Sequence, residues 1–547
     1  MVFKNIYGPG KLDFPLFGDA ATNEFNTVVL RAGANDGYSW NAAQFTEQYL
    51  RDEFGRDLQE ASGNVNAHGN FVQLYINGVY WGLYNPVERP DEEFAATYFG
   101  GTPDQYDVIH RGGGSFEVQN GTLDAWTAML AKSAQAGSSL SAYMELQGKN
   151  LDGTTNPATP ALLDVDSYIR YIAINAWGGN WDWPRNNYFA SRDTDPATTT
   201  GFEFFGWDIE NTMGNNLSRS PLNADVFDPT KAPGNNFTGS DSAGQPHVSL
   251  LPNAEYKINF ADQVQKMFFN GGILTPASLI ARYQVLANTV QSAIVAESAR
   301  WGDMHYPTAP LTPANWVSER DWILNTYLPQ RTGIVLAEFK KYGLYPSVDA
   351  PTFNQFGGNY AGGFKLSIGN SNSGGTVYYT LDGSDPRLVG GALNTTAKIY
   401  SGPLELSGSV TVQARYRSAS GVWSALVEAP FAQTSIGAVL GDFNRDGTRS
   451  SADLVPMMQA LTDLNTFQST NGLSSANLMA LGDMNGDGVF NNADLQPFLT
   501  LLRSGSGGGN GSVAPANESN SAKSALLAAV SDKILATPAP GNQAADD

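Results

Sequence analysis

A repeated acidic loop near the C-terminus constrains the fold of this chain more than any other feature. Its two copies read GDFNRDGTRSSADL and GDMNGDGVFNNADL, so each contains D-x-N-x-D-G and an aspartate at position twelve. Oxygen ligands at positions 1, 3, 5 and 12, with glycine at position 6 for the turn, are what Ca²⁺ requires in an EF-type loop. The predicted ligands are Asp442, Asn444, Asp446 and Asp453 in the first loop, Asp483, Asn485, Asp487 and Asp494 in the second, and the backbone carbonyls of Thr448 and Val489. The repeat therefore predicts a calcium-binding module in which each loop leads into a helix, near Ser451 and near Asn492.

The paired loops and helices of residues 437–504 resemble a type I dockerin. This resemblance implies Ca²⁺ as a cofactor and a cohesin-like partner. The pairs Ser451-Ala452 and Asn492-Ala493 stand where cellulosomal dockerins frequently have Ser-Thr, which leaves the partner open. Calcium-binding acidic loops suit a calcium-rich, extracytoplasmic setting.

Composition limits the functions open to the chain. Its 547 residues are too many for one core and predict three or four domains. With 53 acidic against 32 basic residues, the net charge of −21 repels nucleic acids and anionic lipids. No cysteine is present, so disulfides, thiolate nucleophiles and cysteine-ligated zinc are excluded, and the four histidines lack metal-ligand spacing. We expect neither a nucleic-acid partner nor a membrane span, because no apolar run is long enough to cross a bilayer.

The start of the chain does not read as a secretion signal. The residues after Met1, VFKNIYGPGKLDFPLF, already resemble the inside of a domain. We therefore expect a truncated N-terminus and an extracellular or cell-surface protein whose signal peptide is not part of this chain.

The stretch from Trp177 to Gly214 has the order of parts of a phosphoryl-transfer catalytic loop. It contains WGGNWDWPRNNYF and GFEFFGWDIENTMG, with Asp182 and Asn187 at the spacing D-x-x-x-x-N. Asp208 ends the second strand-like run, and if the two strands pair as a hairpin, Asn187 and Asp208 face one another. Phosphoryl transfer needs oxygen ligands for Mg²⁺ and a carboxylate that accepts the hydroxyl proton. On the residues alone, the alternative that Asp182 merely caps a helix or a bend is favoured, because short motifs often occur by chance.

The N-terminal region reads as strand, helix and hairpin, as in the small lobe of a kinase. Phe25 to Arg31 has the β-branched density of a buried strand. Gln44 to Glu60 is periodic for a helix, with one side formed by Phe45, Tyr49, Leu50, Phe54 and Leu58. Phe71 to Glu88 alternates apolar and polar residues around Asn77-Gly78, a strong hairpin signal. Three later helices of a larger lobe are expected over Asn253 to Asn270, Thr275 to Arg300 and Asn315 to Tyr342.

Several motifs in this order resemble the spore coat protein H (CotH) family of atypical kinases. They are LYINGVYWGLYNPVERPDEEF, GNWDWPRNNYF, FFGWDIENTMG and AESARWGD, and the similarity extends over residues 1 to about 345. The resemblance implies a two-lobed kinase-like fold that binds ATP with Mg²⁺ or Mn²⁺ and phosphorylates protein hydroxyls outside the cytoplasm. It reverses the preference for a structural role of Asp182, which matches the catalytic aspartate. Asp208 matches the metal-binding aspartate, and Asn187 matches the loop asparagine.

The resemblance also implies a nucleotide site. Arg31, or a missing upstream lysine, would face the α- and β-phosphates of the nucleotide. Glu53 would be the ion-pair partner of this cation; the alternative is that the Glu53 side chain is solvated. Glu88 lies where a kinase hinge would, and the alternative for it is a salt bridge to Arg89 or a neighbouring arginine. Two departures are the absent N-terminal segment of the family and Glu210, which stands where another aspartate is common.

The long Gly-, Pro-, Asn- and Ser-rich tract after Gly214 sits where an activation or substrate-binding segment would. A mobile surface insert fits its composition equally well.

Residues 355–432 read as short strands with Gly-rich turns, such as GGTVYYTLDGSDP. They resemble the small β-sandwich at the C-terminus of chitobiase and β-hexosaminidase, which implies a spacer or a weak carbohydrate-binding unit. Residues 505–547 read as a flexible tail.

The sequence thus predicts a multidomain α+β protein: a kinase-like domain, a β-sandwich and a dockerin-like module. The predicted function is a secreted Ser/Thr kinase with an unknown protein substrate. The alternative is a non-catalytic extracellular scaffold or attachment protein that uses the dockerin and is associated with polysaccharide. A third option, a polysaccharide-degrading enzyme, is suggested only by the kinds of module that accompany the kinase-like domain.

Overall fold

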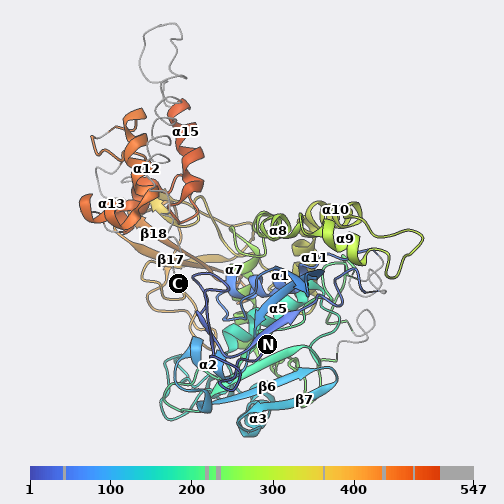
Figure 1. Ribbon diagram of the computed structural model, residues 1–547. Helices are drawn as coiled ribbons and strands as arrows, with labels where there is room; N and C mark the ends of the chain where they lie inside the picture. The colour runs from blue at the N-terminus through green and yellow to red at the C-terminus, as the bar shows by residue number, and fades with distance from the viewer. Residues whose placement is uncertain are drawn as a thin grey trace. The chain divides into compact units, whose positions relative to one another are not determined.

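The computed structural model describes residues 1–40, 45–215, 221–228, 236–360, 364–433, 439–446, 448–471, 473 and 475–504. These residues belong to two compact units (Figure 1). The first contains Met1–Asn354, Ser367–Gly402 and Thr411–Glu428, and the second contains Gln355–Leu366, Pro403–Val410 and the chain from Ala429 onward. Helices and strands alternate along the chain, which confirms the multidomain α+β prediction. The predicted tail, 505–547, lies outside the described residues.

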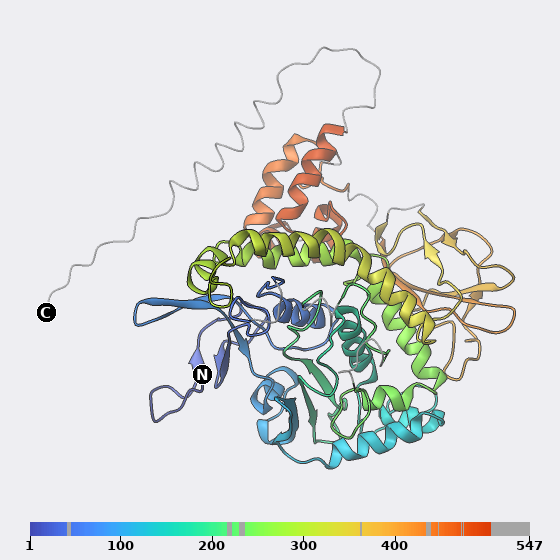
Figure 2. The same cartoon turned by 90° about the vertical axis from the view of Figure 1, so that its right-hand side faces the viewer.

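A three-stranded antiparallel sheet, in the order β3-β5-β4, lies in the N-terminal part of the first unit. Its strands are β3 (Val28–Arg31), β4 (Val72–Ile76) and β5 (Val79–Glu88). The turn between β4 and β5 is Asn77-Gly78, and both residues have positive φ, 51° and 79°. Such a turn matches the twist of the flanking strands, so the predicted hairpin is confirmed. Figure 2 shows it as a blue ribbon that extends away from the neighbouring helices. The short strands β1 (Leu12–Asp13) and β2 (Glu24–Phe25) form a separate pair.

Helix α1 (Arg51–Ala61) begins later than the sequence predicts. Phe45 and Tyr49 have φ of 71° and 65°, a left-handed backbone that an α-helix excludes. The carboxylate of Asp36 accepts backbone N–H groups of Gln48, Leu50 and Arg51, and so holds the turn that leads into the helix. Leu50, Phe54 and Leu58 are buried as expected, whereas Phe45 is exposed. Residues 41–44 lie outside the described residues.

A four-stranded antiparallel sheet, in the order β7-β6-β8-β9, carries the predicted catalytic stretch. Its strands are β6 (Tyr106–Gly112), β7 (Ser115–Asn120), β8 (Tyr188–Asp193) and β9 (Glu203–Gly206). Helix α5 (Val165–Gly178) precedes β8 and ends at Gly179, whose φ of 64° forms a left-handed C-cap. The helix–loop–strand order around the loop is therefore as predicted.

Helices surround α5 in the first unit. They are α2 (Glu92–Phe99), α3 (Asp124–Ala136), α4 (Leu140–Leu146), α6 (Gln245–Leu250), α7 (Ala254–Phe268), α8 (Pro276–Val290), α9 (Ile294–Trp301), α10 (Pro313–Trp322) and α11 (Leu328–Lys341). In Figures 1 and 2, α3 and the β6–β7 hairpin lie on one side of α5, and α8 to α11 lie on the other. The large buried core that joins them includes Trp126, Tyr168, Trp177 and Phe204.

Two of the long predicted helices are interrupted. The run Thr275 to Arg300 divides into α8 and α9, because hydrogen bonds such as Ala293 N–H to Val290 O reach three residues back instead of four. The run Asn315 to Tyr342 contains a π-helical turn, Ile323–Tyr327, between α10 and α11. The single-helix prediction for each run is therefore wrong in detail.

Strands beyond residue 350 occur in both units. In the first unit β10 (Thr352–Phe353) pairs with β13 (Ile368–Gly369), and β14 (Thr376–Thr380) pairs with β15 (Lys398–Ile399) and β17 (Val410–Arg417). Arg415 of β17 pairs with Asp262 of α7 and with Asp385. In the second unit β12 (Lys365–Leu366) pairs with β16 (Leu404–Glu405), and β11 (Gly358–Tyr360) pairs in parallel with β18 (Val427–Gln433).

The second unit ends in a small helical module. Each predicted loop leads into a 3₁₀ turn, Ser451–Asp453 or Asn492–Asp494, followed by α12 (Leu454–Thr462) or α15 (Leu495–Ser504). Helices α13 (Leu464–Asn471) and α14 (Ser475–Gly482) lie between the two loops in the sequence. The core contains Phe443, Met457, Phe467, Phe490 and Phe498. Across the described part of the chain, no helix is both long enough and apolar enough to span a membrane.

Candidate functional site

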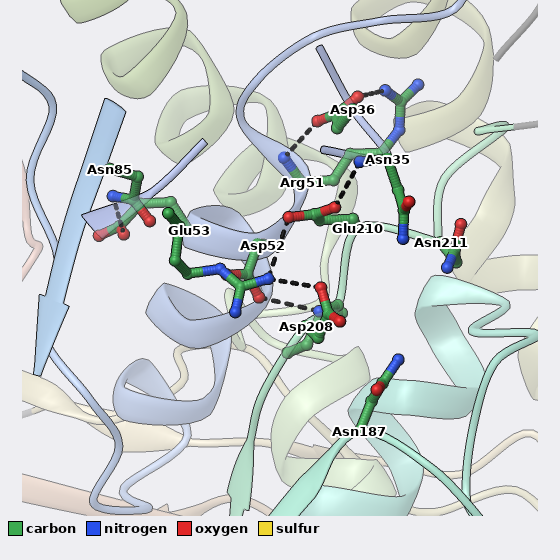
Figure 3. A network of polar contacts seen from close by, with 12 residues as sticks. Asn35, Asp36, Arg51, Asp52, Glu53, Asn85, Asn187, Asp208, Glu210 and Asn211 are labelled. Carbon is green, nitrogen blue, oxygen red and sulfur yellow. Dashed lines mark hydrogen bonds and ion pairs between the residues drawn. The ribbon is translucent and has the colours of Figure 1, made fainter. Parts of the chain in front are cut away.

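The register of β8 and β9 brings Asn187 and Asp208 to one edge of the sheet. Tyr188 is the partner of Gly206, so the residue before β8 and those just after β9 leave the sheet at the same end. The predicted pairing of the two strands is thus confirmed, and Figure 3 shows both side chains at this edge. Asn187 and Asp208 have φ of 58° and 57°, a backbone region that non-glycine residues seldom occupy. Such strain persists where the surrounding structure fixes it, and it is concentrated at functional sites.

Asp182 is partly buried and held by amide groups. It accepts hydrogen bonds from the side-chain nitrogens of Asn186 (3.3 Å), Asn187 (3.0 Å) and Asn211 (3.4 Å). Burial raises the pKa of Asp182, and the nearby charge of Asp208 raises it further. The carboxylate is therefore oriented by its neighbours and is a better proton acceptor than an exposed aspartate.

Arg31 connects Asp208 to two other carboxylates. Its guanidinium pairs with Asp52 (2.8 Å), with Glu210 (3.0 Å) and with Asp208. Burial opposes a charge at this position, but the three carboxylates outweigh burial and raise the pKa of Arg31. The pKa of Asp208 is raised, chiefly by burial, although Arg31 partly offsets the shift. Arg31 thus pairs with three converging carboxyl groups, one of which, Asp52, also pairs with Arg56.

Glu210 shares one guanidinium nitrogen of Arg31 with Asp208. It also accepts the backbone N–H of Asn35 at 2.8 Å. Burial, together with the charge of Asp208, raises the pKa of Glu210 to about 8. This carboxyl group therefore gives up its proton at a higher pH than an exposed glutamate does.

The predicted ion pair between Arg31 and Glu53 is wrong. On α1 the partner of Arg31 is the preceding residue, Asp52, which also accepts the backbone N–H of Ile209 (2.8 Å). Glu53 instead pairs with Arg56 and accepts a hydrogen bond from the Asn85 side chain (2.9 Å). Adjacent helical residues point about 100° apart, so the rotation of α1 decides which acid faces β3.

Glu88 has a different role from both predicted alternatives. It is buried and accepts hydrogen bonds from the backbone N–H (3.0 Å) of His68 and from the Tyr98 hydroxyl (2.7 Å), and its carboxylate lies 2.7 Å from His68 Nδ1. Burial works against the charge of His68, yet its bonds to Glu60 and Glu88 raise its pKa to about 10. Arg89, the predicted salt-bridge partner, contacts Gln119. Because both carboxylate oxygens are engaged inside the fold, we assign Glu88 a structural role and not a nucleotide contact.

Comparison with known proteins identifies two families along the chain. Residues 11–335, more than half of the chain, match the model of the family described as CotH kinase protein. The chain belongs to the CotH kinase protein family. Residues 356–428 match the chitobiase/β-hexosaminidase C-terminal domain, as the sequence predicts.

Two curated relatives come from Rhizopus delemar. Invasin CotH2 is 26% identical over 245 residues, which are 41% of this chain and 40% of that protein. Invasin CotH3 is 24% identical over 243 residues, 41% of this chain and 39% of that protein. The chain thus spans less than half the length of the relatives it matches.

The oxygen atoms at the edge of the CotH sheet suit a hard divalent cation. Mg²⁺ prefers one or two carboxylates with additional oxygen ligands and water, and Asp208, Asn187 and Asp182 offer this donor chemistry. The raised pKa of Asp182 reflects in part the charge of Asp208, so the two carboxylates interact electrostatically. Within the described ranges, no group of three or more His, Cys, Asp or Glu residues is arranged to hold a metal.

The two repeat loops hold their carboxylates with their own backbone. Asp453, at position twelve, accepts the N–H groups of Asn444 (2.9 Å) and Ser450 (2.7 Å). Asp494 accepts the corresponding groups of Asn485 (3.1 Å) and Asn491 (2.9 Å). Both position-twelve carboxylates are buried, and the remaining donors are oxygens of the type that Ca²⁺ binds. Gly447, the position-six glycine of the first loop, lies outside the described residues.

Proposed function

We propose that the CotH domain transfers the γ-phosphoryl group of ATP to Ser or Thr hydroxyls of a protein substrate. In this proposal Asp182 is the general base, and Asn187 and Asp208 hold Mg²⁺ or Mn²⁺. The observation that supports it most strongly is the register of β8 and β9, which brings Asn187 and Asp208 together next to Asp182. A kinase-like domain with two lobes follows from the same proposal.

The side chains of the site match the requirements of phosphoryl transfer. Asp182 lies between three amide groups that orient it to accept the proton of the acceptor hydroxyl. A bound divalent cation would neutralise phosphate charge between Asn187 and Asp208. Arg31 stands beside Asp208 and is placed to contact a phosphate oxygen when Glu210 holds a proton and competes less for the guanidinium. These residues therefore supply position and charge, which are what this reaction asks of the protein.

A second function is favoured by the names of the relatives. Both Rhizopus proteins are called invasins, and we infer from this an alternative in which the chain is an extracellular attachment protein without phosphoryl transfer. In either case we propose that the C-terminal module binds Ca²⁺ and docks onto a cohesin-like partner, and that the chitobiase-like strands act as a spacer or bind carbohydrate weakly.

Nucleotide binding distinguishes the two functions. The kinase proposal predicts that ATP with Mg²⁺ raises the thermal unfolding temperature of the full chain and that labelled phosphate is transferred to a protein acceptor. An unchanged unfolding temperature with Mg²⁺ or Mn²⁺, together with no transfer, would favour attachment and contradict the kinase proposal.

A further inference from the structure

Residues 236–243 pack directly on the catalytic loop. The backbone N–H of Ala243 donates to the carbonyl of Pro184 at 3.0 Å, and the ring of Phe237 stands edge-on to Trp183 with centroids 5.3 Å apart. These residues form the end of the long insert that follows the metal-binding Asp208. The segment therefore covers the loop that carries Asp182, at the position where an acceptor chain would approach if the insert is the substrate-side segment.

Asp241 is the single charged residue of this segment and meets two arginines. The Arg185 Nε lies 2.9 and 3.1 Å from the two carboxylate oxygens of Asp241, and the Arg111 Nε lies 3.5 Å from one of them. The side chains of Arg111 and Asp241 are 11% and 20% exposed, so this contact is more strongly shielded from water than an ordinary surface ion pair. Removing the carboxylate would take away the ion-pair partner that Arg111 and Arg185 share.

The contact joins Asp241 to both ends of the catalytic loop. Arg185 lies three residues after the base Asp182, within about 11 Å along a fully extended chain. Tyr188, the residue after Asn187, donates its hydroxyl to the backbone carbonyl of Asp241 at 3.0 Å. Arg111 is the register partner of Tyr188 on the neighbouring strand β6. A single residue of the insert is therefore tied to the loop between the base and the metal ligand, and to the strand that follows it.

Other contacts hold the backbone of the segment but do not depend on charge. Trp126 Nε1 donates to the carbonyl of Ser240 (2.8 Å), and the Tyr168 hydroxyl donates to that of Ala243 (2.6 Å). Because these bonds persist when the carboxylate is neutral, loss of the charge at Asp241 should loosen the segment without unfolding the domain.

We propose that Asp241 is a positioning residue that keeps residues 236–243 closed on the catalytic loop and so fixes Asp182 and Asn187 for the acceptor. In switchable kinases a phosphorylated side chain supplies the negative charge that orders such a segment through arginines. Here the charge belongs to an aspartate and is permanent, so closure requires no modification. This inference rests on the proposed kinase function.

The absence of cysteine allows a direct test of the charge. In an Asp241→Cys variant the new thiol is the only one in the chain, and it can be alkylated with iodoacetate, which restores a carboxylate, or with iodoacetamide, which leaves a neutral amide of similar size. We expect the neutral form to lose about tenfold in kcat/KM for the acceptor, with an unchanged KM for ATP, and the carboxymethylated form to recover most of the loss. Amide hydrogen exchange in residues 236–243 should be faster in the neutral form only. Asp241→Glu should retain most of the activity.

A matched control is Glu145→Gln, which removes the Lys132–Glu145 ion pair of 2.8 Å between α3 and α4 and should change neither measurement. Equal transfer rates of the two alkylated forms, or equal exchange in residues 236–243, would overturn the positioning role. Because both forms come from one variant, a general folding defect would make them alike and would count against the proposal. Failure of the native chain to transfer phosphate would instead contradict the kinase function. Amide hydrogen exchange in the two alkylated forms would then still show whether a negative charge at position 241 keeps residues 236–243 closed.

Discussion

The acidic groups of the CotH site and those of the C-terminal repeat loops are stabilised in different ways. At the CotH site, Asp208 and Glu210 contact Arg31, which lies 177 and 179 residues away in the sequence. In the repeat loops, Asp453 and Asp494 accept backbone N–H groups that lie within ten residues. The first arrangement depends on the folding of distant elements, whereas the second forms within a single loop.

The pKa values differ accordingly. Burial raises the pKa of Asp208 and that of Glu210. In the first repeat loop, hydrogen bonds from Thr448 and Asn444 lower the pKa of Asp446, which is exposed. Asp208 and Glu210 therefore keep their protons to higher pH than exposed acids do, whereas Asp446 loses its proton more readily and is available to a hard metal ion. In the second loop burial raises the pKa of Asp483, so the contrast applies to Asp446.

The largest expected effect in the CotH site is on the reaction. Asp182→Asn keeps the size of the side chain and removes its ability to accept a proton. We expect phosphate transfer to fall about 10²- to 10⁴-fold, with little change in the unfolding temperature, measured as the initial rate of transfer from ATP. Asp193→Asn, at the opposite end of β8 from Asn187, is the matched control and should retain activity. Transfer that survives Asp182→Asn would show that this carboxylate is not the base.

The dependence of the CotH carboxylates on a distant cation is tested by Arg31→Gln. The change removes the counter-ion that Asp208 and Glu210 share in a buried setting, whereas Asp52 keeps its ion pair with Arg56. We expect the free energy of unfolding to fall by about 3–5 kcal/mol, and less at acidic pH, where the carboxyls are neutral. Denaturant unfolding of the full chain at two pH values measures both effects.

A control on the opposite side of α1 sharpens this result. Arg282→Gln breaks an ion pair with Asp57 whose two side chains are 39% and 32% exposed, so we expect a loss below about 1 kcal/mol. Equal losses in the two variants would mean that Arg31 is no more important than a surface arginine.

Features determined by local sequence were predictable. Asn77-Gly78 requires two left-handed residues, which identifies a turn without reference to the rest of the chain. The positions of the repeat loops relative to α12 and α15 follow from the spacing of the loop residues alone. At the CotH site, the pairing of β8 with β9 could be expected because the two strands are neighbours in the sequence, and it carries Asn187 to Asp208.

Features that depend on tertiary packing were not predictable. The periodic pattern before Arg51 indicated a helix, but the backbone at Phe45 and Tyr49 turns left-handed, which delays the start of α1. The late start does not itself identify the partner of Arg31, because Asp52 and Glu53 are both acidic and only the rotation of the folded helix distinguishes them. The contact of Arg185 with Asp241 joins residues 56 positions apart across an insert without periodicity, so no sequence pattern indicated it.

The local loops are tested by removal of calcium from the full chain. Since Ca²⁺ would bind the folded loops and not the unfolded ones, free Ca²⁺ at a hundred times its Kd stabilises the module by about 2.7 kcal/mol. We expect EDTA to lower the helical circular dichroism signal and the unfolding temperature of this module, and Ca²⁺ to restore both more effectively than Mg²⁺. Asp453→Ala and Asp494→Ala should each reduce the response. Helicity that does not respond to EDTA would contradict calcium binding.

The smallest expected effect is the change in the free energy of unfolding per pH unit that Glu210 confers. An unfolded glutamate loses its proton near its ordinary pKa of 4.5, whereas the folded protein keeps it to about pH 8. Between these values the folded state binds more protons than the unfolded state, so the free energy of unfolding falls as pH rises, by at most about 1.4 kcal/mol per pH unit. Glu210→Gln resembles the protonated form at every pH and should flatten this slope, so that the variant is more stable than the native chain near pH 8. Denaturant unfolding from pH 5 to pH 8 measures the difference, and Glu145→Gln, an exposed glutamate, should leave the slope unchanged. If Glu210 instead made the native chain more stable as pH rises, Arg31 would be keeping the Glu210 carboxylate ionised. Its pKa would then be lowered, as that of Asp446 in the first repeat loop is, and the contrast between the two sites would disappear.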